Sequence, residues 1–452
     1  MQTISAEQAL LPGGWHRDVR VRVDDQGRIA EVAPGQGDAP AGILLPAPGN
    51  LHSHAFQRAM AGLTEARGPQ GSDSFWTWRQ LMYRFLDHLT PEDVEAIAAL
   101  AQVEMMEAGF AACGEFHYLH HQPDGTRYDD PAELSARIAA AAAETGIGLT
   151  HLPVLYMQGG TDGRALEGGQ RRFGNDLEGF ARLLEGASEA LAFLAADTVL
   201  GVAPHSLRAV TVDALTEAAR LRPDEPFHLH IAEQRAEVVE VLAAHGATPV
   251  KWLLEIMDVD PRWCLIHATQ MSPEETLGLA RSGAVAGLCP ITEANLGDGI
   301  FDGARFQEAG GRFGVGSDSN IRISLTGELR SLEYSQRLRD RGRALLAEEA
   351  RSTGRVLLQS VCEGGAQAMG RDSGAIEVGK WADLMRLDTT DLDLEGLESD
   401  TALDAWIFAG GTGRVRDLWS AGRHQVRDGR HTARDRVEAR YRPVARRLRH
   451  AL

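Results

Sequence analysis

The chain has 452 residues and a formal net charge of −18, and its hydrophobic (43%) and charged (24%) fractions are those of an ordinary globular protein. Its apolar runs are shorter than the roughly 18 to 20 residues that a membrane span requires. The negative charge opposes binding to nucleic-acid backbones and anionic membranes. The N-terminus lacks the basic segment and apolar block of a secretory signal. We therefore expect a cytoplasmic protein with no nucleic-acid or membrane partner.

Both ends of the chain show the alternating apolar pattern of short strands. This alternation flanks a turn at residues 25–27 near the N-terminus and two glycines near the C-terminus. We expect the two ends to pair into a small β-sandwich domain built from residues 1–47 and 369–452, with a helix at the end of the chain. The segment from Arg414 to Arg449 interleaves arginines with acidic residues, which predicts a solvated face.

Between residues 48 and 368, apolar strand-like runs alternate with helix signals. Three helices are well marked by their capping residues and terminal glycines, and they are expected at 90–109, 130–146 and 272–283. The strand-like runs are 43–45, 111–119, 147–157, 198–206, 226–233, 262–268, 284–290 and 312–318. Eight βα units indicate an α/β fold, a parallel (β/α)8 barrel of the TIM type, whose active site lies at the C-terminal ends of the strands.

Histidines gather at the predicted strand ends. His52 and His54 follow the first run with a spacing of two, so both imidazoles lie on one side of an extended chain. His230 and His267 end two later runs, and Asp318 ends the last. A lone His-x-His pair is as often an ordinary polar loop. The barrel, however, brings all of these strand ends to one rim, so we expect the five side chains to form one cluster.

The residue types of this cluster predict a metal centre. Imidazoles with one carboxylate and no thiolate suit Zn²⁺ or Fe²⁺ better than Mg²⁺ or Ca²⁺. We expect one divalent metal, either Zn²⁺ or Fe²⁺, held by His52, His54, His230 and Asp318. Such a site leaves a position for water, which a metal makes acidic enough to ionise near neutral pH.

Three side chains beside the predicted metal are candidates for the chemistry. Glu233 stands three residues after His230, and we expect it to carry a proton from water to the leaving group; the competing interpretation is a carboxylate that favours a helix start. His267 is either a fifth ligand or a neighbour that orients the nucleophile, and we favour the neighbour. Asp318 is expected both to touch the metal and to accept a proton from the water.

The order of these motifs resembles that of a known family. His-x-His after the first strand, His-x-x-Glu after the fifth, His after the sixth, Asp after the eighth and the segment GAIEVGKWADLMRLD resemble the amidohydrolase superfamily and its cytosine-deaminase-like branch. Within that branch, LHSHAFQRAMAGLTE, DSFWTWRQLMYRF, APHSLRAV, HIAEQ and CPITEANLGDGIF resemble the N-formimino-L-glutamate iminohydrolases. The resemblance covers nearly the whole chain. It implies a homodimeric hydrolase of histidine degradation that converts N-formimino-L-glutamate and water to N-formyl-L-glutamate and ammonia with one divalent metal, usually zinc.

The resemblance also implies a set of substrate-binding residues: Gln57, Tyr118, His205, Arg208 and Arg79, the last preferred over Arg84. A dicarboxylate needs fixed cationic donors, and Arg208 stands three residues past His205 on a predicted strand-end loop, where its fork can face the barrel mouth. The competing interpretation is a surface arginine. The loop at 69–86, with Phe75, Trp76 and Trp78, either closes over the site as a lid or packs against the barrel.

Two other functions compete with this one. A hydrolytic deaminase of a nucleobase or related aromatic amidine would use the same metal and Glu233, but a neutral ring gives no reason for the charged fork of Arg208. A non-catalytic barrel would not need every ligand together with Glu233. His205 ends the predicted fourth strand where a carbamate-bridged two-metal site would carry a lysine, which argues for one metal. Arg386, where the family more often has an apolar residue, lies in the small domain and puts no catalytic residue in doubt.

Overall fold

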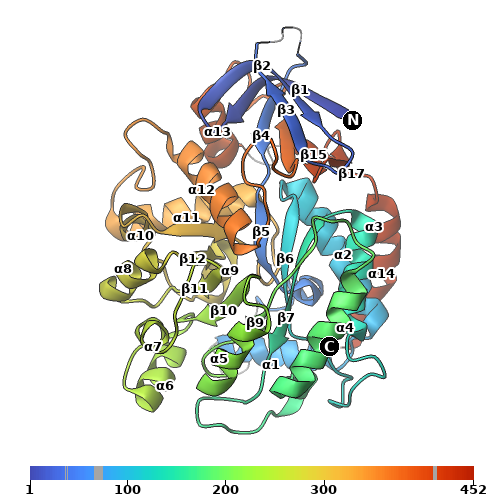
Figure 1. Cartoon of the computed structure of the whole chain (residues 1–452), viewed down its shortest axis with the longest axis vertical. Coiled ribbons are helices and arrows are strands. Elements are labelled where there is room, and N and C mark those ends of the chain that lie inside the picture. Colours follow the sequence, from blue (N-terminus) through green and yellow to red (C-terminus); the bar gives the residue numbers. More distant parts are fainter. Residues whose placement is uncertain (36, 38, 66–74, 411–414, 452) are drawn as a thin grey trace.

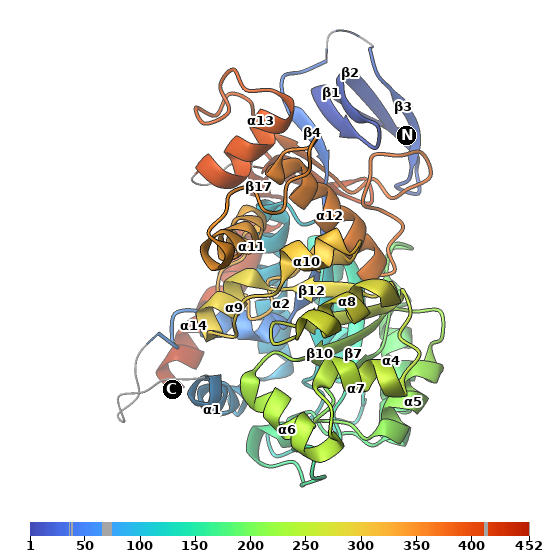
Figure 2. The ribbon, with the colours of Figure 1, turned by 90° about the vertical axis from the view of Figure 1, so that its left-hand side faces the viewer.

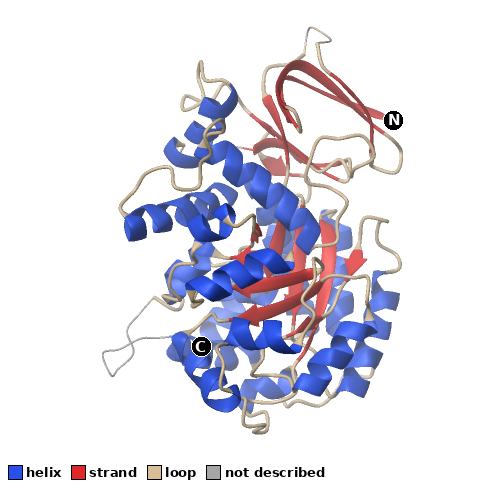
Figure 3. Ribbon diagram, turned by 60° about the vertical axis from the view of Figure 1, so that its left-hand side comes forward, coloured by secondary structure: helices blue, strands red, loops and turns tan. Residues whose placement is uncertain are grey.

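The structure, a computed structural model, describes residues 1–35, 37, 39–65, 75–410 and 415–451. A barrel of parallel strands lies at its centre with helices around it, and a smaller domain of strands lies at one end (Figures 1 and 3). Figure 2 shows the same small domain from the side, at one end of the barrel. The predicted (β/α)8 fold with a separate strand domain is confirmed.

The barrel strands pair in chain order. One parallel path runs from the first barrel strand to the fourth, and a second runs from the fifth to the eighth. Isolated parallel bridges join the two paths, Ser53 to Asp318 on one side and Ser206 to His230 on the other. The strands are β5 (Gly49–Ser53), β6 (Ala112–His117), β7 (Gly148–Leu155), the split strand β8 (Val199–Leu200) and β9 (Ala203–Pro204), β10 (Phe227–Ile231), β11 (Trp263–His267), β12 (Val285–Leu288) and β13 (Arg312–Val315).

The first barrel strand differs from the prediction. The apolar run at 43–45 forms β4 (Ile43–Pro46), which belongs to the small domain, and the barrel begins only with β5. Strand β5 has the sequence GNLHS, whose polar residues gave no apolar signal although all five are buried. A Cβ at Gly49 would lie 2.4 Å from the sulfur of Met369, so the methionine side chain would have to shift. Since β5 leaves the small domain, its C-terminal end points away from that domain (Figure 1).

Two of the three predicted helices begin and end at their capping residues, and the third begins at Glu133, three residues after its predicted start. Thr90 and Asp93 form a capping box at the start of the second helix, and Gly109 ends it in the left-handed conformation. The barrel helices are α1 (Phe75–Leu86), α2 (Pro91–Ala108), α3 (Glu133–Thr145), α4 (Leu177–Leu191), α5 (Val212–Leu221), α6 (Arg235–His245), α7 (Pro249–Ile256), α8 (Pro273–Ser282), α9 (Pro290–Leu296), α10 (Gly303–Glu308), α11 (Leu325–Asp340) and α12 (Thr353–Ala368), with 3₁₀ turns η1 (Ala55–Met60) and η2 (Gly168–Arg172). Within the described ranges, no helix is long and apolar enough to cross a membrane.

The small domain is one eight-stranded sheet to which both chain ends contribute. Strand β4 connects the two halves because it pairs in parallel with the first strand and antiparallel with β14. The two halves enclose a common apolar core that includes Val21, Leu44, Leu384 and Trp419. Arg386 lies here, and its Nε donates to Asp417 at 2.9 Å. The strands are β1 (Gln2–Leu11), β2 (Gly14–Val23), β3 (Ile29–Ala33), β4, β14 (Leu384–Leu387), β15 (Val415–Ser420), β16 (Arg423–Arg427) and β17 (Arg430–His431). Between β14 and β15 the chain forms helix α13 (Ser399–Asp404) and the π turn η3 (Ala405–Ala409).

The arginine-rich end of the chain is more than a solvated face. It forms helix α14 (Arg434–Ala451), which packs along α2 beside α3 (Figure 1). Its arginines form ion pairs with acidic residues of those helices, among them Arg434 with Glu107 at 2.9 Å and Arg440 with Glu95 at 2.8 Å. Each exposed pair contributes little. Together they explain why basic residues concentrate on this helix of an acidic protein.

Candidate active site

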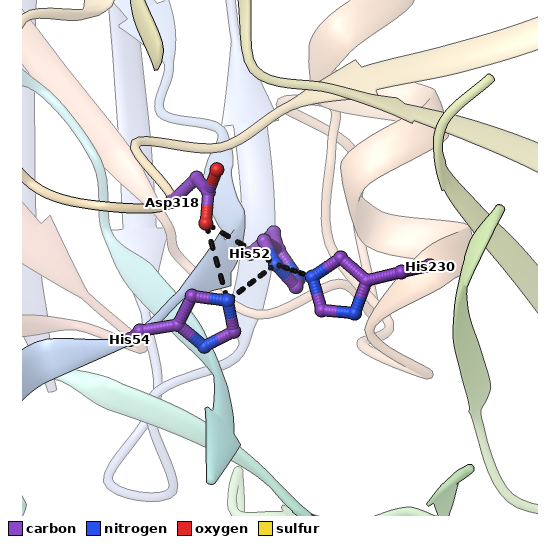
Figure 4. A group of neighbouring side chains, drawn as sticks. All are labelled: His52, His54, His230 and Asp318. Carbon is purple, nitrogen blue, oxygen red and sulfur yellow. Dashed lines mark hydrogen bonds and ion pairs between the residues drawn. The ribbon is translucent and has the colours of Figure 1, made fainter. Parts of the chain in front are cut away.

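Four predicted metal ligands meet at the C-terminal ends of the barrel strands (Figure 4). His52 lies on β5, His54 precedes η1, His230 lies on β10 and Asp318 follows β13. The Nε2 atom of His52 is 3.2 Å from that of His54 and 3.1 Å from that of His230. The Oδ1 atom of Asp318 is 3.2 Å from His54 Nε2 and 3.6 Å from His52 Nε2. These ligand atoms all lie within 4.8 Å of one another.

The surroundings of these imidazoles expose the lone pairs that a metal needs. The Nδ1 atom of His54 donates to the carbonyl of Phe116 at 2.9 Å, and that of His230 donates to the carbonyl of His205 at 3.1 Å. Their Nε2 atoms then carry lone pairs that converge on one point. Burial, together with neighbouring imidazoles, lowers the pKa of His52 and of His230 well below its usual value, which favours the neutral form. Converging lone pairs repel unless a cation lies between them, so this donor set fits a divalent metal.

His267 lies beside the converging group and is held by carboxylates. Its Nδ1 is 3.2 Å from Glu293 Oε1, while its Nε2 faces Glu233 Oε1 and Asp318 Oδ2, each at 3.8 Å. Burial alone would lower the pKa of His267, but the carboxylates of Glu233, Glu293 and Asp318 raise it to about 10. An imidazolium of this kind donates hydrogen bonds and does not bind metal, which supports the role of a neighbour.

A second group of potential ligand atoms is less suited to a metal. His267, Cys289 and Asp318 also place their ligand atoms within 4.8 Å of one another. Burial raises the pKa of the Cys289 thiol well above its usual value. Because metals bind the thiolate form, this group offers fewer donors than the three histidines with Asp318.

Glu233 is held at the wall of the site by its own backbone. Its N–H donates to Glu237 Oε2 at 3.0 Å, and its carbonyl accepts from Thr269 Oγ1 at 2.8 Å. The carboxylate is therefore left to face His267. Burial raises the pKa of Glu233, although His267 opposes the rise. A carboxyl group with a raised pKa suits proton transfer near neutral pH.

The backbone is strained at this rim. Five residues here have positive φ values, in a region that residues other than glycine rarely adopt. They are Ala232 (49°), His267 (70°), Ala268 (50°), Asp318 (45°) and Asn320 (54°). These residues follow or end β10, β11 and β13. Such strain persists only where the surrounding structure enforces it, and it is concentrated at functional sites.

A pocket opens onto the metal-binding group, and about 60 Å³ of its space is open to a molecule the size of water. It collects every predicted substrate-binding side chain except the less favoured Arg84, which is exposed and outside it. The lining residues are His54, Gln57, Trp78, Arg79, Met82, Tyr83, Tyr118, Tyr156, Phe173, His205, Arg208, His230, Glu233, His267, Leu296, Asp318 and Ser319.

The polar groups of the pocket are fixed by one another. Gln57 Nε2 donates to the Tyr118 hydroxyl at 2.7 Å, and Arg79 Nη2 donates to the Tyr156 hydroxyl at 3.0 Å. The ring of His205 packs against Tyr156 at a centroid distance of 4.6 Å. Arg208 is only 8% exposed, and none of the ion pairs among the described residues involves its guanidinium. A buried cation without a direct ion pair is suited to bind an anionic group of a ligand.

The predicted lid falls largely outside the described part of the chain. Residues 69–74 are not described, and neither are the side chains of Phe75 and Trp76. Trp78 lies on α1, lines the pocket and packs against the barrel core. The choice between lid and packed loop stays a prediction.

Comparisons with known proteins place this site in a family. The family model described as "Amidohydrolase family" matches residues 40–424. The chain belongs to the amidohydrolase family. A second model, described as "Formimidoylglutamate deiminase HutF, N-terminal domain", matches residues 1–42 of this amidohydrolase. A curated formimidoylglutamate deiminase of Pseudomonas aeruginosa is 51% identical over 442 residues, which cover 96% of this chain and 97% of the relative.

Solved structures agree with the fold of this amidohydrolase. An amidohydrolase from Brucella melitensis has a TM-score of 0.95 and 50% identity, with coverage of 99% of this chain and 100% of the other. A zinc-bound adenosine deaminase from Xanthomonas campestris has a TM-score of 0.82 at 22% identity, with coverage of 99% and 98%, and shows the fold alone. A 5-methylthioadenosine/S-adenosylhomocysteine deaminase from Natronomonas pharaonis is 27% identical over 85% of this chain and 83% of the relative.

The sequence interpretation missed three residues that support the site. Glu293 binds His267, Glu237 binds the backbone of Glu233, and Tyr156 binds Arg79. Glu293 stands within the segment CPITEANLGDGIF, and its spacing of four from Cys289 matches a carboxylate that caps its own helix. That local signal was available in the sequence, but the contact with His267 depends on the barrel.

Proposed function

We propose that the protein hydrolyses N-formimino-L-glutamate to N-formyl-L-glutamate and ammonia. The observation that carries this proposal is the buried guanidinium of Arg208, without an ion-pair partner among the described residues, in a pocket that also contains the His/Asp group. A dianionic substrate supplies the missing partner. The 51% identity to a formimidoylglutamate deiminase over nearly the full chain supports the same substrate.

The proposed metal is a single Zn²⁺, with Fe²⁺ as the alternative, held by His52, His54, His230 and Asp318. When bound there, a divalent metal makes a water molecule acidic enough to lose a proton near neutral pH. The neutral, tautomer-fixed imidazoles and the single carboxylate favour such a borderline cation over Mg²⁺ or Ca²⁺. The bound zinc named for the Xanthomonas campestris adenosine deaminase belongs to that protein and is consistent with this choice.

The proposed chemistry moves two protons. The water oxygen bonds to the carbon of the protonated formimino group, while Glu233 takes one water proton and delivers it to the terminal nitrogen. The bond between that carbon and that nitrogen then breaks, and ammonia leaves. Asp318 accepts the second water proton as the formyl C=O forms, and this proton finally converts ammonia to ammonium. His267, whose Nε2 lies 3.8 Å from both carboxylates, donates toward the charge on the attacking oxygen.

We propose that cationic residues of the pocket bind the carboxylates of the substrate and that anionic residues bind its formimino group. Arg208 and Arg79 bind the two carboxylates, because guanidinium forks match carboxylate geometry. Gln57, Tyr118 and His205 supply further hydrogen bonds from the wall they share with Arg79. The cationic formimino group lies toward Glu233 and Asp318. The substrate is thereby oriented with its reactive carbon beside the proton carriers.

Four finer features accompany this proposal. We infer a homodimer in the cytoplasm that acts in histidine degradation, without nucleic-acid or membrane partners. The resemblance to the iminohydrolases supports the dimer and the pathway, and the net charge of −18 supports the absence of polyanionic partners.

A second candidate, deamination of a purine or related ring, is favoured by the 27% identity to a 5-methylthioadenosine/S-adenosylhomocysteine deaminase. The aromatic lining of the pocket, with Tyr118, Tyr156 and Phe173, would accept a ring. Arg208 argues against it, since a neutral ring leaves the guanidinium without an anion.

An ammonia-release assay distinguishes the two candidates. The purified, zinc-loaded protein is offered N-formimino-L-glutamate, N-formimino-L-aspartate, cytosine and guanine in parallel. We expect N-formimino-L-glutamate to have the highest kcat/KM, by at least about 100-fold over either base, because only it pairs with the arginines. Faster ammonia release from a nucleobase than from N-formimino-L-glutamate would overturn the proposal.

A further inference from the structure

Three of the four metal-facing side chains lie on the seam where the barrel closes. The last strand, β13, meets the first, β5, at a single isolated bridge between Ser53 and Asp318. Two backbone hydrogen bonds hold it: His54 N–H to the Asp318 carbonyl and Asp318 N–H to the His52 carbonyl, both at 2.9 Å. Other neighbouring strands, such as β6 and β7, form ladders of several residue pairs, except where isolated bridges join β10 to the fourth barrel strand. The mutual position of these ligands therefore depends on a short backbone contact.

A continuous chain of side-chain hydrogen bonds crosses the same seam. Asn50 Nδ2 donates to Ser317 Oγ at 2.5 Å, and Ser317 N–H donates to Asn50 Oδ1 at 3.0 Å. Ser317 Oγ then donates to Asn320 Oδ1 at 2.6 Å. Asn320 Nδ2 completes the chain by donating to Ser53 Oγ at 3.1 Å and to the His54 carbonyl at 3.2 Å. Each amide and hydroxyl is used in a direction that is consistent with its neighbours.

Burial makes this chain costly to interrupt. Asn50, Ser53, Ser317 and Asn320 are each at most 1% exposed. Loss of one member leaves its partners as unpaired polar groups in the protein interior, which costs more than the hydrogen bond itself. The chain ends on the carbonyl of His54 and includes Ser317, the residue before Asp318. It thus fixes the two segments that carry the ligands and not the barrel wall in general.

We propose that Asn320, acting with Asn50 and Ser317, is a positioning residue that sets the separation of His54 and Asp318 and so determines how tightly the site holds its metal. This inference rests on the proposed metal centre. Asn320 does not point a ligand at the metal; it acts through the backbone of His54 and through Ser317, the residue before Asp318. Its left-handed backbone, at φ 54°, is one that asparagine adopts more readily than most residues.

The test compares zinc affinity with the stability of the metal-free protein. The variants are Asn320→Gly, which keeps the left-handed backbone without strain, and Ser317→Ala. Each has a matched control: Asp428→Gly, at an exposed turn with φ 49°, and Ser135→Ala, at a buried serine on α3. The zinc dissociation constant is measured by competition with a chelator, and the unfolding of the metal-free protein is measured by urea titration.

We expect the dissociation constant to rise about 10- to 100-fold in Asn320→Gly and by a smaller factor in Ser317→Ala, with both controls unchanged. Both variants should have nearly the activity of the parent at saturating zinc but much less than the parent at limiting zinc, because they retain every residue that takes part in the chemistry. The double variant should lose less than the product of the single losses, since either change breaks the same chain. Unchanged zinc affinity in Asn320→Gly would overturn the inference, as would additive losses in the double variant. A parent protein that binds no metal would instead refute the proposed metal centre.

Discussion

Two clusters of buried histidines lie on the same barrel. The inner cluster, His52, His54 and His230, meets Asp318 (Figure 4), and His54 and His230 line the pocket. The outer cluster, His117, His120 and His151, lies on and after β6 and β7, with ring centroids of His117 5.4 Å from His151 and 5.5 Å from His120. Phe116 packs against the inner histidines, so His117, the next residue of the strand, points to the other side.

The two clusters differ in the partners of their ring nitrogens. In the inner cluster, backbone carbonyls hold the Nδ1 atoms of His54 and His230, and a carboxylate joins the converging Nε2 atoms; only the Nδ1 atom of His52 has no partner among the described residues. In the outer cluster, both nitrogens of His151 and one each of His117 and His120 have no hydrogen-bond partner among the described residues. The ligand atoms of the outer cluster do not come together as a metal-binding group in the part of the chain that the structure describes. Burial and residue type are shared, so it is convergence with a carboxylate that makes a metal centre.

The largest expected effect is loss of the inner cluster. His230→Asn should release the metal and lower kcat/KM by at least about 10³-fold, because the nucleophile is no longer activated. The matched change in the outer cluster, His117→Asn, should keep the metal and lie within about threefold of the parent. Metal analysis and the ammonia assay on both variants provide the comparison. Metal loss in His117→Asn would contradict the claim that only the inner cluster binds metal.

Glu233 offers the next largest effect and separates chemistry from metal binding. Glu233→Gln keeps the shape of the side chain but cannot carry a proton, so the rate should fall by about 10² to 10⁴ while the metal content stays near normal. Glu255, an exposed glutamate of α7, provides the control variant Glu255→Gln. If Glu233→Gln loses its metal, the residue is a ligand and the assigned role is wrong.

Arg208 extends the comparison to the recognition of substrate in the pocket. Arg208→Met should lower kcat/KM for N-formimino-L-glutamate at least tenfold, since a charge-assisted pair contributes about 1.5 to 3 kcal/mol. A formimino compound without the two carboxylates should be much less affected, and Arg84→Met, on the exposed side of α1, should change neither rate. The four rate constants form a double cycle. Equal losses for the two substrates would assign Arg208 to the fold.

The smallest effect concerns the outer cluster and pH. Burial lowers the pKa of His151 to about 3, so the unfolded chain, with its ordinary value near 6.5, binds the proton first as pH falls. This contribution to stability is complete above about pH 6.5 and is lost between about 6.5 and 3, at about 1.4 kcal/mol per pH unit. Urea unfolding of the metal-free protein at pH 7.5 and 5.5 should show a loss that is about 1 kcal/mol smaller in His151→Leu. Equal losses in parent and variant would show that the buried imidazole of His151 does not contribute to the pH dependence of stability.

The site residues that stand at the ends of barrel strands could be predicted from the sequence. The histidines and Asp318 follow apolar runs, and the (β/α)8 order brings such strand ends together, so their meeting could be expected. Strand β5 could not be placed, because GNLHS is buried by its position at the seam and not by apolar side chains. The same holds for Asn320 and Ser317, which read as an ordinary polar loop until β13 is set beside β5. Likewise, the arginines of α14 look solvated until the acidic faces of α2 and α3 are adjacent.

The central claim is that one cluster of histidines holds one catalytic metal. Its most direct test is a titration of the metal-free protein with zinc, with ammonia release from N-formimino-L-glutamate followed at each addition. We expect activity to rise in proportion to zinc and to reach its plateau at about one equivalent, as a mononuclear hydrolytic site requires. A plateau reached only at two equivalents, or full activity before any zinc is added, would contradict the account.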